Sequence, residues 1–334
     1  MARTPAARAR GFTLVELLVV VGIIALLIGI IVATLGPARN KARVMSCAAR
    51  LKSIGTGVQL HMTDNRDQLP QMQIDGQGVR VPVGGNGTTM GPLFGGKIGL
   101  VRPVQGDFGL HRYGAASRPI NRYLDVKGAP PDPATTGDES PEAVRKLSEE
   151  FEIDVFHSPM DRGFGIPAEF LGLLPEDAAA AGSVYNAFGT SYILNDHAIS
   201  DAGEGGADPI ERPTLIPCRG GRAPRIETPD QTWVGASYAI YNYDAGRDLG
   251  IRWHSRDRVE ANILFADQHV DTSLPVASGS DLKLLRRFEG GPEWTDNQTS
   301  PAPASATNVT LNYSFLPTRD WWTLEESLPC LGQN

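Results

Sequence analysis

Apolar residues are concentrated near the start of the chain. Residues 12–35 contain a single charged residue, Glu16, and otherwise only apolar, small or hydroxyl side chains. As an α-helix this run is about 36 Å long, enough to cross a hydrocarbon core of about 30 Å. The run has no polar face, which disfavours a buried core helix, and it exceeds the apolar region of a secretory signal peptide. The pattern therefore favours a transmembrane helix over residues 12–35.

Residues 36–64 follow the periodicity of an amphipathic helix. Apolar residues recur at spacings of three and four, which places them on one helical face. The members of this face are Val44, Cys47, Ala48, Leu51, Ile54, Val58 and Met62. Gly55 and Gly57 weaken the later turns, and we expect the helix to end near Asp64, before Pro70. The two segments together predict one long helix that continues beyond the membrane.

The remaining residues, 65–334, predict a loop-rich, mainly antiparallel β head. Gly (37 residues) and Pro (25) are both abundant, which is typical of a chain with many turns. Strands are expected at residues 152–156 and 261–266, with one more from His269, and a short helix is expected at 142–151. Residues 231–243 are expected to be β-rich and are aromatic. The predicted fold class is α+β, a helical stem followed by a β-rich head.

Composition narrows the possible functions. The net charge of -7 argues against a general nucleic-acid-binding protein, which would show a basic surface. Hydrophobic residues make up 41% and charged residues 21%, as in ordinary globular proteins. The three cysteines, Cys47, Cys218 and Cys330, have no Cys-x-x-Cys spacing, so they cannot form a thiolate zinc site and allow at most one internal disulfide.

The segment before the apolar run carries the most specific motif in the chain. Residues 1–10 contain three arginines and no acid, and they precede Gly11-Phe12-Thr13-Leu14-Val15-Glu16. A basic leader, a glycine, a Phe-Thr-Leu-x-Glu signature and a long apolar helix together resemble the type IV prepilin and type II secretion pseudopilin family. The resemblance is complete over this signature. Charge alone does not set the topology, because basic residues also follow the apolar run.

The resemblance implies a processing and assembly pathway. Prepilin peptidase would remove residues 1–11 on the cytoplasmic side, and the mature chain would begin at Phe12, which is N-methylated in the family. Glu16 would then pair with the free amine of a neighbouring subunit's Phe12 and favour assembly into a filament. The resemblance also implies that residues 12–35 span the inner membrane, in contact with its lipid, and that the head lies outside the cytoplasm.

The head carries a second resemblance, to bacterial prepilin-like proteins of similar length. Its elements are Cys47-Ala-Ala-Arg-Leu-Lys-Ser-Ile-Gly55, Ser158-Pro-Met-Asp161, Ser191-Tyr-Ile-Leu-Asn195 and Phe265-Ala-Asp-Gln-His-Val270. Two positions depart from the pattern. Ser158 replaces a cysteine, so no disulfide can form at that turn, and Gln268 replaces a glycine.

One cluster in the head is a candidate metal site. His254, Asp267, His269 and Asp271 are the candidates, and residues 267, 269 and 271 would share one face if all three lay on a strand. The alternative is that Asp267 is a turn residue that binds nearby backbone. No metalloprotease helix or hydrolase elbow motif is present, so we expect neither an enzyme nor a cofactor.

Two functions remain open from the sequence. The first is a structural subunit of a type II secretion pseudopilus or a type IV pilus-like filament, with prepilin peptidase and other pilin-like subunits as partners. The second is a membrane-tethered module whose head binds a metal or a glycan without forming a filament.

Overall fold

The computed structural model describes the stem helix and most of the head. The described residues are 14–83, 88–89, 91–102, 109–164, 181–195, 222–223, 226, 229–230, 232–243 and 250–276. The chain divides into two compact units between Arg43 and Val44.

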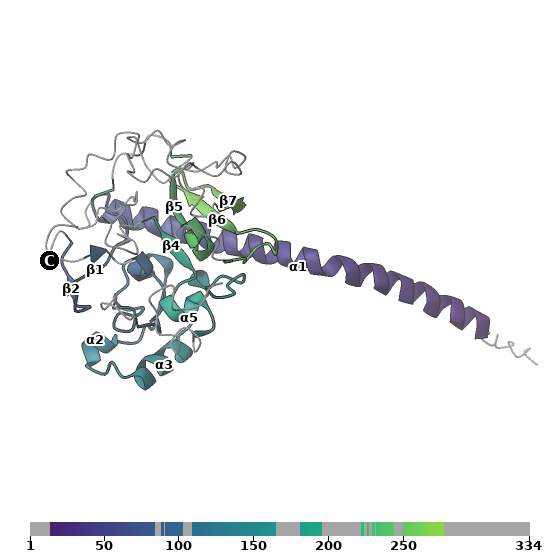
Figure 1. Cartoon of the computed structure of the whole chain (residues 1–334), viewed down its shortest axis with the longest axis horizontal. Coiled ribbons are helices and arrows are strands. Elements are labelled where there is room, and N and C mark those ends of the chain that lie inside the picture. Colours follow the sequence, from purple (N-terminus) through teal and green to yellow (C-terminus); the bar gives the residue numbers. More distant parts are fainter. Residues whose placement is uncertain are drawn as a thin grey trace, which may run out of the picture. The chain divides into compact units, whose positions relative to one another are not determined.

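A single helix, α1 (Leu14–Asp64), begins the described chain (purple in Figure 1). It runs through Pro37 without a break, so the two helical segments predicted from the sequence form one element. The helix ends at Asp64, as predicted, where Asn65 donates backbone and side-chain hydrogen bonds to His61 O. Those bonds satisfy a carbonyl that would otherwise lack a partner at the helix end.

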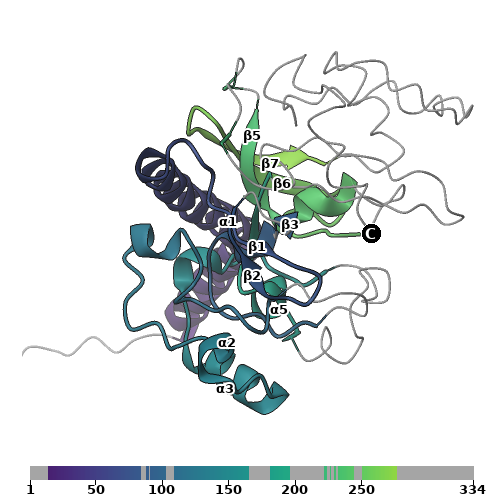
Figure 2. The same cartoon turned by 90° about the vertical axis from the view of Figure 1, so that its left-hand side faces the viewer.

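The described part of the head contains two antiparallel sheets. The first has the order β2-β1-β3 and the second has the order β4-β5-β6-β7. The strands are β1 (Gln73–Ile74), β2 (Arg80–Val81), β3 (Thr88–Thr89), β4 (Tyr192–Leu194), β5 (Trp233–Ser237), β6 (Glu260–Phe265) and β7 (Val270–Pro275). Figure 2 shows β5, β6 and β7 side by side. The α+β fold class is therefore confirmed.

Short helices fill the connections between the strands. They are η1 (Gly91–Phe94), η2 (Asn121–Leu124), α2 (Pro133–Thr136), α3 (Pro141–Glu150), η3 (Asp154–Phe156), α5 (Val184–Phe188) and η5 (Tyr238–Tyr243). The predicted helix at 142–151 corresponds to α3. It starts there because the Ser140 hydroxyl accepts a hydrogen bond from Ala143 N and because Pro141 occupies the first helical position.

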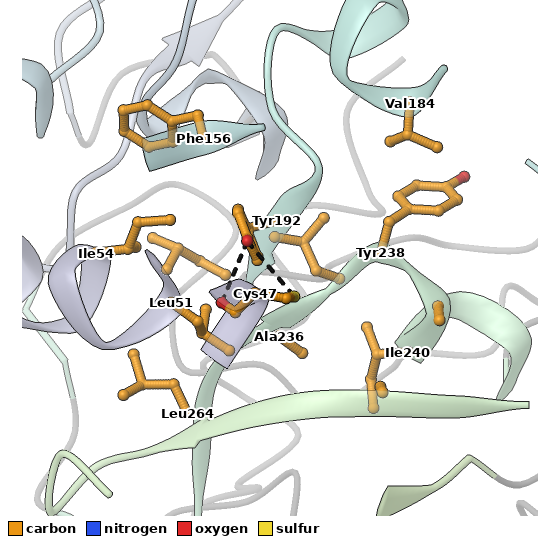
Figure 3. Packing of buried hydrophobic residues seen from close by; sticks show 14 of the residues in the cluster. Cys47, Leu51, Ile54, Phe156, Val184, Tyr192, Ala236, Tyr238, Ile240 and Leu264 are labelled. Atoms are coloured by element: carbon orange, nitrogen blue, oxygen red, sulfur yellow. Dashed lines mark hydrogen bonds between the residues drawn. The ribbon is translucent and has the colours of Figure 1, made fainter. Parts of the chain in front are cut away.

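The second half of α1, residues 44–64, packs into the main core. The predicted apolar face is confirmed, since Cys47, Leu51 and Ile54 are each 0% exposed. Figure 3 shows these side chains beside Leu264 and Ala236 of the larger sheet. Two long-range hydrogen bonds fix the contact. Tyr192 Oη donates to Cys47 O over 3.2 Å, and Asn262 Nδ2 donates to Val44 O over 2.9 Å.

Gly55 and Gly57 lie where the helix approaches the head most closely. A Cβ atom at Gly55 would come within 2.8 Å of Leu264 Cδ1, and one at Gly57 would come within 3.0 Å of Ile120 Cγ1. Their low helix propensity is therefore offset by close packing, because no larger residue leaves room for these neighbours.

One strand prediction was wrong. Residues 152–156 contain the 3₁₀ helix η3 instead of a strand, with Phe156 N donating to Ile153 O and His157 N to Asp154 O. The turn buries Phe156, whose ring packs edge-on against Phe94 with 5.9 Å between centroids. Residues 231–243, expected to be β-rich, contain β5, and the chain turns into η5 at Tyr238.

Candidate functional site

The first half of α1, residues 14–43, exposes its apolar side chains on all sides. Leu17, Ile24 and Leu27 are 57%, 49% and 52% exposed, and these values are typical of the whole run up to Leu35. Among the described residues, α1 is the one helix that is long and apolar enough to cross a membrane. Water disfavours a surface of this size, so the segment requires lipid or other apolar helices around it.

Glu16 lies in the first turn of α1 and is exposed. A carboxylate near a helix N-terminus is stabilised by the helix dipole and by the backbone N–H groups that lack acceptors within the helix. Its immediate neighbours Val15 and Leu17 are 66% and 57% exposed apolar residues, so the charge stands in an otherwise apolar surface. Gly11 and Phe12, the predicted processing residues, lie outside the described part of the chain.

The turn at Asp161 has a structural role. Asp161 Oδ1 accepts hydrogen bonds from Gly163 N and Val184 N, and Oδ2 accepts from Tyr185 N and Ser191 Oγ, at 2.7–3.0 Å. The carboxylate thus caps helix α5 and joins the turn to the residue that precedes β4. Since both oxygens are occupied, this motif offers no open ligand.

Ser158 belongs to the same network. Its backbone N donates to Ser191 Oγ and its hydroxyl accepts from Met160 N. Nearby, the Cys47 thiol is buried and free; burial raises its pKa, and hydrogen bonds to Ser158, Tyr192 and Asn262 act in the opposite sense. Cys218 and Cys330 lie outside the described residues.

Three of the four predicted metal-site residues meet at the turn between β6 and β7. Asp267 Oδ1 accepts a hydrogen bond from His269 N (3.0 Å) and lies 2.5 Å from His269 Nδ1, while His269 Nε2 lies 3.9 Å from Asp271 Oδ2. Slight burial acts to raise the pKa of Asp267, but the hydrogen bonds from His269 outweigh it and lower that pKa. Only Asp271 lies on β7, so the three side chains do not share a strand face.

This geometry is that of a hydrogen-bonded turn. The direct contact between Asp267 and His269 leaves no space for an ion between those two atoms. Among the described residues, no group of three or more His, Cys, Asp or Glu side chains is arranged to hold a metal. Gln268 has φ of 74°, a left-handed conformation that glycine adopts most readily.

The fourth candidate, His254, is buried away from solvent. Its Nδ1 lies 3.3 Å from Ser273 Oγ on β7. Burial lowers the pKa of His254 to about 4, and the positive charge of Arg162 acts in the same direction. His254 is therefore neutral at pH 7.

The sequence did not predict the two most deeply buried charged side chains among the described residues of the head. Arg118 is 2% exposed, and its guanidinium donates to the carbonyls of Tyr113, Pro92, Gly95 and Phe188. Lys97 is 1% exposed and donates to Ser148 O and Glu152 Oε1. Both hold loops together. No local pattern marks them, because most of their acceptors lie 23 to 70 residues away in the sequence.

The comparisons with known proteins bear on the start of the chain. Residues 6–32 match the family model of the prokaryotic N-terminal methylation motif. No curated protein and no solved structure gives a match. The motif implies a prepilin-like protein that prepilin peptidase processes, and together with one long apolar helix it indicates a membrane-anchored, extracytoplasmic, pilin-like protein, a class that is typically non-enzymatic.

Proposed function

We propose that this chain is a structural subunit of a type II secretion pseudopilus or type IV pilus-like filament. Residues 1–11 are the leader that prepilin peptidase removes after Gly11. Residues 12–35 are the transmembrane segment, residues 36–64 extend it as an amphipathic helix, and residues 65–334 form the extracytoplasmic head. The other partners are pilin-like subunits and the lipid of the inner membrane.

The observation that carries this proposal is the exposed apolar surface of residues 14–35. Most of this surface lies within the matched prepilin-type motif, residues 6–32. Its side chains include Leu14 and Leu26, which are 81% and 66% exposed. A surface without a polar face fits two successive environments, lipid before assembly and neighbouring helices afterwards.

Glu16 would set the stagger between the α1 helices of neighbouring subunits. Cleavage after Gly11 creates a free amine at Phe12, four residues before Glu16. If two parallel helices are staggered by roughly one turn, the amine of one copy meets the carboxylate of the next. In a low-dielectric surrounding such a pair counts heavily, and leaving either charge alone is costly.

Processing is the first test of the proposal. Intact-mass analysis of the protein extracted from membranes of cells with a prepilin peptidase should give a chain that begins at Phe12 and carries one methyl group. Replacing Gly11 with a bulky residue should leave the leader attached. A mature chain that begins at Met1, or beyond Leu35, would contradict the proposal.

The second candidate left open by the sequence is a membrane-tethered metal-binding module, and the turn at Asp267 is where it can be tested. Two carboxylates and an imidazole gather there, even though their direct hydrogen bonding is that of a turn. Elemental analysis of the purified full chain distinguishes the two. Background metal in both the wild type and Asp267→Asn supports the structural subunit, whereas stoichiometric metal that is lost in Asp267→Asn would favour the binding module.

A further inference from the structure

Three exposed basic side chains follow the apolar run. Arg39, Lys41 and Arg43 are exposed, and within the described residues they form no hydrogen bond or ion pair. The next two basic residues differ. Arg50 donates to His157 O and Lys52 donates to Gln268 O, so both are bound to the head. We define residues 39, 41 and 43 as the basic belt.

The basic belt occupies two opposite sides of the helix instead of one. At 100° per residue, Arg39 and Arg43 point to nearly the same side, whereas Lys41 points to roughly the opposite one. A protein partner that docks on one face would meet only part of this charge. A layer of anionic groups around the helix would meet all of it.

The position of the belt along α1 matches a membrane boundary. Arg39 follows Glu16 by about 35 Å of helix, close to the thickness of a hydrocarbon core. When Glu16 lies at one boundary, the belt lies among the headgroups of the other. No acidic residue occurs between Glu16 and Asp64, so nothing along this stretch of helix neutralises the belt.

We propose that the basic belt binds the anionic headgroups of membrane phospholipids. Arg39, Lys41 and Arg43 contact the headgroup phosphates, and their charge enriches anionic lipid around the helix. The lipid contact holds the subunit in the membrane before assembly. This inference rests on the proposed membrane insertion of residues 12–35.

The test uses the full chain reconstituted in bilayers of phosphatidylcholine with a minority of phosphatidylglycerol. The protein is extracted in mild detergent, and the bound phospholipids are quantified by mass spectrometry. We expect phosphatidylglycerol to be enriched about twofold or more over its bulk fraction, since each basic residue near a surface gives roughly a fivefold preference for an anionic neighbour and only some bound lipids touch the belt. Raising the salt concentration should reduce the enrichment.

Two variants make the test specific. Arg39→Gln/Lys41→Gln/Arg43→Gln should lower the enrichment to the bulk value. Lys127→Gln/Arg145→Gln/Lys146→Gln removes the same charge from head side chains that are 81%, 65% and 71% exposed, and it should retain the enrichment. Equal enrichment in the wild type and the belt variant, or none in the wild type, would overturn the inference. A wild-type chain that fails to insert at all would instead overturn the proposed function.

Discussion

The two halves of α1 share one backbone but have opposite surfaces. In residues 14–43 the large apolar side chains are exposed, with Leu27 at 52%, whereas in residues 44–64 an apolar stripe is buried, with Leu51 at 0%. The stripe has helical periodicity and fits the protein's own head. The first half lacks periodicity, and its surroundings must come from outside the chain. The periodicity of the apolar residues therefore distinguishes a helical segment that packs on its own domain from one that contacts lipid or other subunits.

Truncation of one leucine in each half should give the largest difference in stability between the two halves. Leu51→Ala should lower the free energy of unfolding of the head by about 2–5 kcal/mol, because it leaves a cavity in a closely packed core. Leu27→Ala removes the same atoms from the exposed half and should leave head stability unchanged. Denaturant unfolding of the full chain in detergent, followed by the fluorescence of the buried Trp233 and Trp253, measures both.

Acid should destabilise the packed half selectively. His61 is 8% exposed; burial lowers its pKa to about 4, the charge of Arg122 acts in the same direction, and Asp64 opposes it. A histidine whose folded-state pKa lies below the unfolded value of 6.5 contributes stability above pH 6.5 that is lost as the pH falls towards 4. The loss attributable to His61 is no more than about 3 kcal/mol.

The control for this prediction is His61→Gln, which cannot titrate. Its free energy of unfolding should fall less steeply between pH 6.5 and 4 than that of the wild type. His254 has a similarly lowered pKa, so the double variant should show a still flatter profile. Identical pH profiles in the wild type and His61→Gln would contradict the burial that we describe for this residue.

A smaller effect is expected from adding one methyl group to a glycine in each half. Gly55→Ala should destabilise the head by about 1–2 kcal/mol, since the clash with the buried Leu264 exceeds the gain in helix propensity of about 1 kcal/mol. Gly29 has nothing within 4 Å of its added Cβ, so Gly29→Ala should not lower head stability. Thermal unfolding of the two variants compares them directly, and a stabilised Gly55→Ala would disprove the close approach.

The sequence predicted those features that depend on local pattern. The buried face of α1, its end at Asp64 and the strand at 261–266 follow from spacing and apolar runs, and the turn at Asp267 follows from the residue type. The strand expected at 152–156 was wrong, because burial of Phe156 against Phe94 is a long-range contact that no local pattern contains. The burial of Arg118 was missed for the same reason, since its carbonyl acceptors lie up to 70 residues away.

The candidate site, unlike the packing of the head, could be predicted from a local motif. The prediction for Gly11, Phe12 and Glu16 rests on a short contiguous motif, and all three residues lie within the range 6–32 that the family model matches. The role that we propose for Glu16 would depend on a second copy of the chain. Folding of one chain places Glu16 in the first turn of α1, but the sequence of one chain does not say how a second copy packs against it.

Self-crosslinking of α1 in membranes tests the central claim most directly. A photoreactive residue replaces Leu27 in the exposed half or, as a control, Ile54 in the packed half, and leader cleavage is monitored in parallel. We predict that position 27 crosslinks to a second copy and position 54 does not. Adding Glu16→Gln should reduce the product at position 27 about tenfold or more while cleavage continues, because one charge of a desolvated pair is lost. Equal crosslinking with and without Glu16 would contradict the account.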